Sequence, residues 1–335
     1  MRSWKRKKNV KEKHSEWFFN NGSTFLQELI ADSNGISNPI RFFSSDQILK
    51  ATDRFNPNCY LSRHRLFTWY KGVIEDRTYA IKKFTDSEFT KERVREVYND
   101  IVLSTRVSNQ SSFLKLLGCS LEFQLPVIVF EFPENGVLNE RGGFGCEDGP
   151  LLPWNIRLKV AKEVAIAVTY LHTAFSRIII HRDIKPTNVF LDKNWKAKLT
   201  DFTFSVTLPE GKSWIEDEVM GTFGYMDPIY YTTGLVTEYT DVFSFGIFML
   251  ILLLGRRAVF AGSSGVPCNI LDYVKDLQER GESIEFGDDL NDMRLGQMKM
   301  FLELALRCYE KRNEDRPKMI LVAKEIKIIE GSIDC

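Results

Sequence analysis

The residues best suited to chemistry lie in one short stretch near the middle of the chain, residues 181–203. Asp183 can accept a hydroxyl proton, and Lys185 can offset negative charge on a transferring group. Asn188 and Asp201 carry the amide and carboxylate oxygens that suit Mg²⁺. Together these residue types suit removal of a proton from a hydroxyl beside a bound Mg²⁺.

The order of these residues resembles the catalytic and metal-binding motifs of protein kinases, H-R-D-x-K-x-x-N followed by D-F-G. Here the second motif reads Asp201-Phe202-Thr203. Lysine two residues after the aspartate is the form seen in Ser/Thr kinases. A β-branched threonine is stiffer than the glycine it replaces, so we expect this loop to hold one conformation. The alternative is that the motif residues are kept for loop architecture alone.

A lysine for the nucleotide phosphates is expected about 100 residues before Asp183. Tyr79-Ala80-Ile81-Lys82 resembles the kinase strand that carries it. Lys83 follows directly, but on a strand its side chain points to the opposite face. Lys82 is therefore the candidate phosphate contact, with Ala80 and Leu61 as further nucleotide-binding candidates.

The partner of Lys82 should be an acid on the following helix. Asp100 stands where kinases have a glutamate, and it is shorter by one carbon–carbon bond, about 1.5 Å. Glu96, one turn earlier on the same helix face, is the alternative partner. A third interpretation is that both acids are solvated.

The glycine-rich phosphate loop of kinases has no counterpart here. Its three glycine positions hold Ser62, His64 and Phe67. A side chain costs about 1–2 kcal/mol wherever a left-handed backbone is needed, and Phe67 adds bulk over the nucleotide. Binding of ATP and Mg²⁺ is therefore left open, and we expect phosphotransfer to be absent or weak.

The segment 203–226 resembles a kinase activation segment, and Thr222 within it is typical of Ser/Thr kinases. Trp214 is the candidate partner contact, because a large exposed aromatic can anchor an interface. The alternative is that it packs against its own lobe. Ile229 replaces a glutamate that normally pairs with a distant arginine, here Arg316. An unpaired buried arginine is costly, so we expect another acid or more solvent there.

Composition narrows the class of protein. The 335 residues include 44% apolar side chains, enough for a large core, and 45 basic side chains balance 45 acidic ones. That balance gives no indication of a nucleic-acid partner. The longest apolar run, residues 245–254, is too short for the about 20 residues of a transmembrane helix, so a buried helix is expected there. Apolar residues from Leu158 to Leu171 recur at helical spacing and predict one face of a long helix. Six scattered cysteines favour free thiols in a reducing cytoplasm.

The pattern of apolar residues predicts an α+β fold, a bilobal kinase fold with a strand-rich N-lobe and a helical C-lobe. Residues 1–20 are expected to be a disordered basic tail, with anionic lipid or an acidic partner as the alternative to simple solvation. Residues 21–54 are expected to form an extension with short helices, one of which follows a capping box formed by Ser44 and Gln47. The kinase-like domain covers residues 55–331, with the N-lobe at about 55–132 and the C-lobe at about 133–329.

Further segments resemble plant receptor-like cytoplasmic kinases. They include Phe43–Thr52, Leu116–Cys119 and Asp241–Gly246, in which Asp241 is expected to bond the backbone of the catalytic loop. Asn139–Gly143 and Leu191–Trp195 resemble the ZED-related kinases and pseudokinases more closely.

The resemblance implies an adaptor that binds a coiled-coil NLR receptor in plant immunity. Such an adaptor senses receptor-like cytoplasmic kinases modified by bacterial effectors. It implies a cytoplasmic protein recruited to the plasma membrane through its partners. The main hypothesis is thus a pseudokinase or atypical Ser/Thr kinase acting as an adaptor. The alternative is a slow but active ATP-dependent Ser/Thr kinase in defence signalling.

Overall fold

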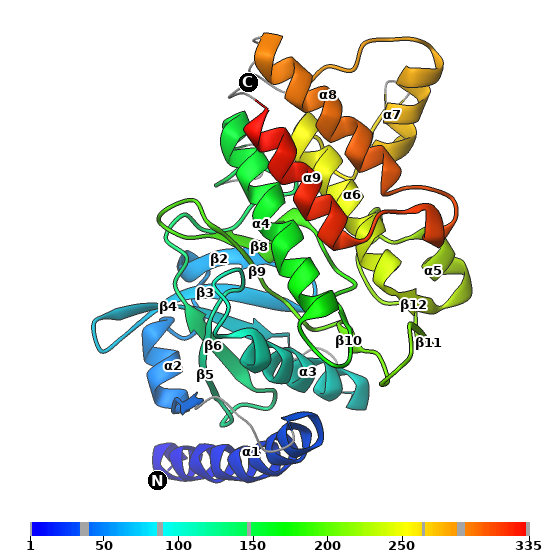
Figure 1. The fold of residues 1–335 in the computed structure, drawn as a ribbon. Coiled ribbons are helices and arrows are strands. Elements are labelled where there is room, and N and C mark those ends of the chain that lie inside the picture. Colours follow the sequence, from blue (N-terminus) through cyan, green and yellow to red (C-terminus); the bar gives the residue numbers. More distant parts are fainter. Residues whose placement is uncertain are drawn as a thin grey trace. The chain divides into compact units, whose positions relative to one another are not determined.

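The computed structural model describes residues 2–33, 40–85, 90–145, 149–262, 265–286 and 292–332. The chain forms two compact units, Met1–Pro133 and Glu134–Cys335 (Figure 1). The first contains the large sheet and the second contains most of the helices, as the bilobal kinase fold requires. Their boundary lies one residue from the one expected between the two lobes.

The first unit is built on a six-stranded sheet with strand order β1-β5-β6-β4-β3-β2. All neighbouring strands are antiparallel except β1 and β5, which are parallel. The elements are α1 (Arg2–Ser33), β1 (Arg41–Phe42), α2 (Ser45–Ala51), η1 (Pro57–Cys59), β2 (Tyr60–Arg63), β3 (Phe67–Ile74), β4 (Arg77–Phe84), α3 (Lys91–Val107), β5 (Leu116–Ser120) and β6 (Val127–Glu131).

The hairpin of β3 and β4 places the phosphate-binding candidates. Its two turn residues, Glu75 and Asp76, have φ of 51° and 60°. Positive φ at both positions is the turn geometry that matches the twist of paired strands. The resulting register sets Trp69 opposite Lys82. Side chains alternate along a strand, so Ala80 and Lys82 share one face of the sheet.

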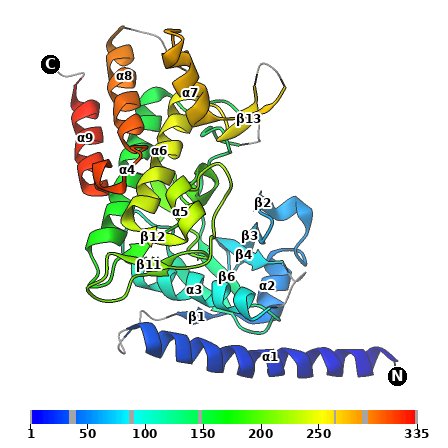
Figure 2. The same ribbon diagram turned by 90° about the vertical axis from the view of Figure 1, so that its right-hand side faces the viewer.

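The N-terminal region differs from the expectation. A disordered tail was expected up to residue 20, but the structure has one helix, α1, over Arg2–Ser33. In two perpendicular views α1 runs across one end of this unit, beside α3 (Figures 1 and 2). Packing of its middle turns on α3 supplies the stability that its charged first turns lack. The short helix expected after Ser44 is present as α2, and the predicted capping box between Ser44 and Gln47 is confirmed.

The second unit is mainly helical. Its α6 is buried on all sides, which confirms the buried helix predicted from the apolar run, and α4 buries the predicted stripe from Leu158 to Leu171. Among the described residues, no helix combines the length and the apolar character needed to span a bilayer. The elements are α4 (Trp154–Thr173), β7 (Ile179–Ile180), η2 (Pro186–Asn188), β8 (Val189–Leu191), β9 (Ala197–Leu199), β10 (Val206–Thr207), β11 (Trp214–Glu216), α5 (Pro228–Thr233), β12 (Leu235–Thr237), α6 (Glu238–Leu254), β13 (Val259–Ala261), β14 (Pro267–Asn269), α7 (Ile270–Glu279), α8 (Asp292–Arg307), η3 (Asn313–Asp315) and α9 (Met319–Gly331).

Candidate active site

The backbone of the catalytic loop in the second unit is hydrogen-bonded to a side chain of α6. Asp241 accepts hydrogen bonds from the backbone N–H groups of His181 and Arg182, both at 2.8 Å. This is the contact that the sequence predicted for Asp241. It matters because Arg182 has φ of 67°, a conformation that non-glycine residues adopt only when the surroundings impose it. The buried carboxylate therefore fixes the loop that presents Asp183.

Asp183 is nearly fully buried and both of its carboxylate oxygens have partners. Oδ2 lies 2.7 Å from Lys185 Nζ and accepts from Asn188 Nδ2 at 3.0 Å. Oδ1 accepts from the Thr222 hydroxyl at 2.6 Å, and Lys185 Nζ donates to the same hydroxyl oxygen at 2.7 Å. The structure thus brings together the candidate base, the charge-offsetting lysine and the activation-segment threonine in one network.

The two metal-ligand candidates lie at one end of the β8–β9 hairpin. Val189 pairs with Leu199, and the next N–H along, that of Thr200, donates to the carbonyl of Asn188 at 3.0 Å. Asp201 follows immediately. The amide of Asn188 donates to the Asp183 backbone and carboxylate, while its Oδ1 is buried and has no hydrogen-bond partner.

This donor set fits Mg²⁺. Mg²⁺ is usually held by one or two protein oxygens together with substrate phosphates, rather than by a complete protein cage. Asn188 offers a buried oxygen without a hydrogen bond, and Asp201 offers a carboxylate. In the part of the chain that the structure describes, no group of three or more His, Cys, Asp or Glu side chains could hold a metal. A metal here would need the phosphates of a nucleotide to complete its coordination.

Thr203, which stands in place of the kinase glycine, bonds to the metal-ligand candidate. Its hydroxyl donates to Asp201 Oδ1 at 2.5 Å, and its backbone N–H reaches the same oxygen at 3.4 Å. Asp201 has φ of 71°. The hydroxyl therefore adds a tether to a residue already in an unusual conformation, and it occupies one acceptor position that a metal would otherwise use. The sequence predicted stiffness at this position but not this hydrogen bond.

In the first unit, Lys82 is paired with Asp100. Lys82 Nζ donates to Asp100 Oδ2 at 2.7 Å, and both side chains are fully buried. Asp100 Oδ1 also accepts from Ser104 at 3.3 Å. Glu96, the alternative partner, pairs instead with Arg93 at 2.6 Å. The shorter acid therefore reaches the lysine.

Aromatic rings cover the ammonium of Lys82. Its Nζ lies 3.8 Å from the ring centroid of Phe67, 4.9 Å from that of Phe84 and 5.7 Å from that of Trp69. A cation within about 6 Å of an aromatic face is attracted to it, and the attraction is strongest when the cation is desolvated. Phe67 occupies the position expected for the third glycine, so the residue that stands in place of glycine contacts the candidate phosphate-binding lysine directly.

Of the other residues at the positions expected for the phosphate loop, His64 joins the same aromatic layer. His64 stacks on Phe67 with ring centroids 4.6 Å apart. Trp69 contacts Phe130, whose strand position is opposite the fully buried Ala80. Ser62 and the half-buried Leu61 lie on β2, where the register with β3 is irregular. The candidate nucleotide contacts Ala80 and Lys82 thus face rings rather than an open glycine loop.

The activation segment is fixed by Arg182 and Tyr230. Arg182 forms an ion pair with Asp217 at 2.9 Å and hydrogen bonds to the carbonyl of Phe204. The Tyr230 hydroxyl donates to the Glu218 carbonyl at 2.9 Å and accepts from the N–H of Met220 at 2.7 Å. These contacts hold the segment between the metal-binding loop and α5.

Two aromatic side chains project from this segment. Trp214, on β11, is 53% exposed, and Phe223 is 77% exposed. The sequence singled out Trp214 but not Phe223. Thr222, the neighbour of Phe223, turns inward to Asp183. The sequence did not indicate that Thr222 would point inward and Phe223 outward.

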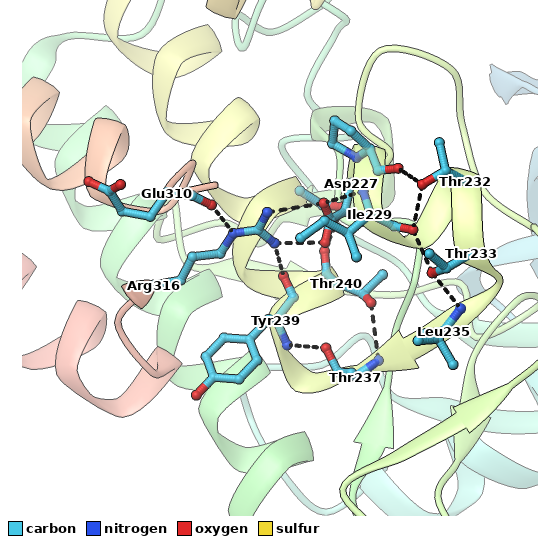
Figure 3. Close-up of polar contacts among 12 residues, drawn as sticks. Asp227, Ile229, Thr232, Thr233, Leu235, Thr237, Tyr239, Thr240, Glu310 and Arg316 are labelled. Atoms are coloured by element: carbon cyan, nitrogen blue, oxygen red, sulfur yellow. Dashed lines mark hydrogen bonds and ion pairs between the residues drawn. The ribbon is translucent and has the colours of Figure 1, made fainter. Parts of the chain in front are cut away.

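Arg316 pairs with Asp227 rather than with the glutamate that kinases usually have (Figure 3). Its guanidinium forms two hydrogen bonds with the carboxylate of Asp227, at 2.7 and 3.1 Å, and Nε donates to the carbonyl of Glu310 at 2.9 Å. Asp227 also caps α5 by accepting from the N–H of Ile229 at 3.0 Å. The expectation of another acid beside Arg316 is confirmed, and that acid lies two residues before the missing glutamate.

Comparison with known proteins agrees with this geometry. The family described as "Protein kinase domain" matches residues 69–327. This chain belongs to the protein kinase family. It is 56% identical over 332 residues to the serine/threonine-protein kinase ZRK1 of Arabidopsis thaliana, with 96% of this chain and 95% of that protein covered.

Two further relatives from Arabidopsis thaliana are named as non-functional pseudokinases. The non-functional pseudokinase ZRK2 is 54% identical over 335 residues, covering 97% of this chain and 93% of that protein. The non-functional pseudokinase ZED1 is 49% identical over 334 residues, covering 96% and 98%. The chain thus belongs to the ZED-related kinase family, which includes named kinases and named pseudokinases.

Proposed function

We propose that this ZED-related protein is a pseudokinase that acts as an adaptor for a coiled-coil NLR receptor in plant immunity. The observation that carries the first half is the state of Lys82. Its ammonium is bound by Asp100 at 2.7 Å and covered by the ring of Phe67 at 3.8 Å. A nucleotide phosphate would have to displace the ring, and no glycine loop is present to supply backbone N–H donors.

The expected loss of rate is large. Kinase catalysis consists mostly of positioning and charge stabilisation, and each 1.36 kcal/mol of lost transition-state stabilisation lowers the rate about tenfold. Three missing glycines and an obstructed lysine each remove part of that stabilisation. The tether from Thr203 to Asp201 further restricts how the metal could be held. Turnover far below the about 1–100 s⁻¹ of ordinary kinases follows.

The adaptor half of the proposal is supported by the resemblance to ZED-related proteins and by the activation segment. That segment is ordered by Arg182 and Tyr230 and presents Trp214 and Phe223 to solvent. A preformed surface with exposed aromatic anchors suits recognition of another protein. We assign this surface to receptor-like cytoplasmic kinases modified by bacterial effectors. The protein would act in the cytoplasm and reach the plasma membrane through these partners.

Phe67 provides the sharpest test of the pseudokinase half. Phe67→Ala and Phe67→Gly should expose Lys82 and produce Mg²⁺-ATP binding detectable by calorimetry, at least tenfold tighter than in the natural protein. Phe67→Leu keeps most of the bulk and is the matched control. Each variant is first checked by thermal unfolding, because truncating a buried aromatic costs about 3–5 kcal/mol. Equal nucleotide affinity in the natural protein and all three variants would refute the role given to Phe67.

The adaptor half is tested by co-purification with a coiled-coil NLR receptor and with a modified receptor-like cytoplasmic kinase. Trp214→Ala and Phe223→Ala should weaken capture of the modified kinase by at least tenfold. Ile328→Ala, which removes a comparably exposed apolar side chain from α9, should leave it unchanged. Full capture by the double variant would remove the activation segment from the interface.

The second candidate function is that of a slow ATP-dependent Ser/Thr kinase. The network of Asp183, Lys185, Asn188 and Thr222 favours it, because each residue is placed as a catalytic loop needs and Asn188 Oδ1 has no hydrogen-bond partner. Phosphotransfer measured on the natural protein separates the two. Activity that Asp183→Asn abolishes establishes the kinase. Activity that persists in Asp183→Asn comes from a contaminant.

A further inference from the structure

The long helix α1 uses one of its sides to hold the first unit together. His14 Nδ1 lies 3.0 Å from Ser45 Oγ, and Asn21 donates to the carbonyls of Leu121 and Phe123 at 2.9 and 2.8 Å. Phe25 is buried and contacts the ring of Tyr98. These positions recur at intervals of seven and four residues, so they form one stripe along the helix.

A second stripe of α1 carries exposed apolar side chains. Phe19 is 70% exposed and Leu26 is 58% exposed, and their spacing of seven residues places them on one side of the helix. Phe18, 41% exposed, lies beside Phe19 with ring centroids 6.0 Å apart. Large apolar side chains grouped on one element are a common sign of an interaction site.

The first part of the same helix carries a local excess of positive charge, although the protein as a whole has a formal net charge of zero. Residues 2–13 contain seven Lys or Arg and one acid, Glu12. The rest of the chain therefore has 38 basic side chains (45 less seven) against 44 acidic ones (45 less one). The positive charge is thus concentrated within the first 12 residues of α1, next to the exposed Phe18 and Phe19.

We propose that α1 binds the anionic lipid surface of a membrane directly, lying in the plane of the interface. The basic residues attract anionic headgroups, and Phe18, Phe19 and Leu26 can enter the boundary between headgroups and acyl chains. The strength of such binding increases with the apolar area that is buried and with the electrostatic attraction, and α1 can supply both. A lipid surface is favoured over an acidic protein because of the length of α1. The basic residues and the exposed rings follow one another along a single helix of about 48 Å. A membrane can contact such a length without a matching groove.

This attachment is separate from the adaptor role, since it needs no partner protein. The test is co-sedimentation of the full chain with phosphatidylcholine vesicles, with and without phosphatidylserine. We expect binding only when phosphatidylserine is present, and weaker binding as salt is raised. Lys7→Glu with Lys8→Glu should weaken binding by at least 25-fold, since each basic residue contributes about fivefold. Phe19→Ser should weaken it severalfold at any salt concentration.

Matched controls lie in the second unit. Lys275→Glu with Lys327→Glu makes the same change of net charge at exposed sites, and Ile328→Ser removes an equally exposed apolar side chain. Neither should change binding by more than twofold. Two results would overturn the proposal. One is binding to vesicles that the α1 variants do not alter. The other is α1-dependent binding to polyglutamate as tight as to vesicles and indifferent to Phe19→Ser, which would indicate an acidic protein.

Discussion

At the scale of single residues, Phe67 both stands where kinases have a glycine and covers the ammonium of Lys82. Phe67 does more than stiffen the phosphate loop, because its ring lies 3.8 Å from the ammonium it would have helped to present to phosphate. The buried pair of Lys82 and Asp100 remains intact because the rings and the pair stabilise each other. The pair of Lys82 and Asp100 is thus part of the buried interior of the first unit.

The pair of Arg316 and Asp227 gives a prediction at the same scale. Both side chains are almost fully buried and joined by two hydrogen bonds. Asp227→Ala should lower the free energy of unfolding by about 3–5 kcal/mol, because it leaves a buried guanidinium without a counter-ion. Urea unfolding of the purified protein measures this change.

A second substitution makes that prediction specific. Ile229→Glu restores the glutamate that other kinases have, so adding it to Asp227→Ala should recover at least half of the lost stability. Ile229→Glu alone should have little effect, because Arg316 is already satisfied. If the double variant is as unstable as Asp227→Ala, Arg316 cannot exchange its partner.

At the scale of elements, α1 acts on the helix that carries Asp100. The Tyr98 hydroxyl donates to Asn21 Oδ1 at 2.9 Å and to its carbonyl at 3.1 Å, while Asn21 bonds the loop between β5 and β6. Asn21→Ala should therefore increase hydrogen exchange across α3 by at least tenfold. The matched control is Thr24→Ala, which removes a local bond within α1 only. Equal exchange in both variants would show that α1 does not restrain α3.

The activation segment gives a second prediction at this scale. Asp217 pairs with Arg182, and this ion pair attaches the activation segment to the catalytic loop. Asp217→Asn should increase the rate of limited proteolysis within residues 210–220 severalfold, because the segment loses its ion pair. The exposed neighbour in Glu216→Gln should behave like the natural protein. Cleavage at the natural rate in Asp217→Asn would mean that this ion pair is not needed to order the segment.

The features that could be predicted from the sequence either involve residues close together along the chain or belong to a known motif. The capping box at Ser44 and the buried α6 follow from local patterns, and Asp241 follows from its motif. Asp227 is 89 residues from Arg316, so the sequence indicated that an acid was needed but not which one. The rings around Lys82 depend on the register of β3 against β4, which only the folded hairpin defines. The length of α1 also escaped prediction, because tertiary packing at Asn21 and Phe25 stabilises a helix whose first turns repel one another.

At the scale of the whole molecule, the four cysteines that the structure describes include one buried in each unit, and its reactivity can report on the folding of that unit. Burial raises the pKa of Cys119 in the first unit and of Cys308 in the second to about 12. Both thiols therefore stay protonated at pH values where an exposed thiol is largely ionised. As pH rises from about 9 toward 12, the unfolded chain ionises these thiols first, so the folded state loses stability over that range.

Alkylation exploits this difference. At pH 8.5, iodoacetamide should modify the partly exposed Cys59 and Cys268 at least 100-fold faster than Cys119 and Cys308, since the thiolate is the reactive form. Site-resolved mass spectrometry gives each rate separately. In increasing urea, Cys119 should become reactive only as the first unit unfolds and Cys308 only as the second does. A single midpoint for both would show that the two units unfold together, and two midpoints that they unfold independently. Rapid modification of either buried cysteine without urea would contradict its placement in the core.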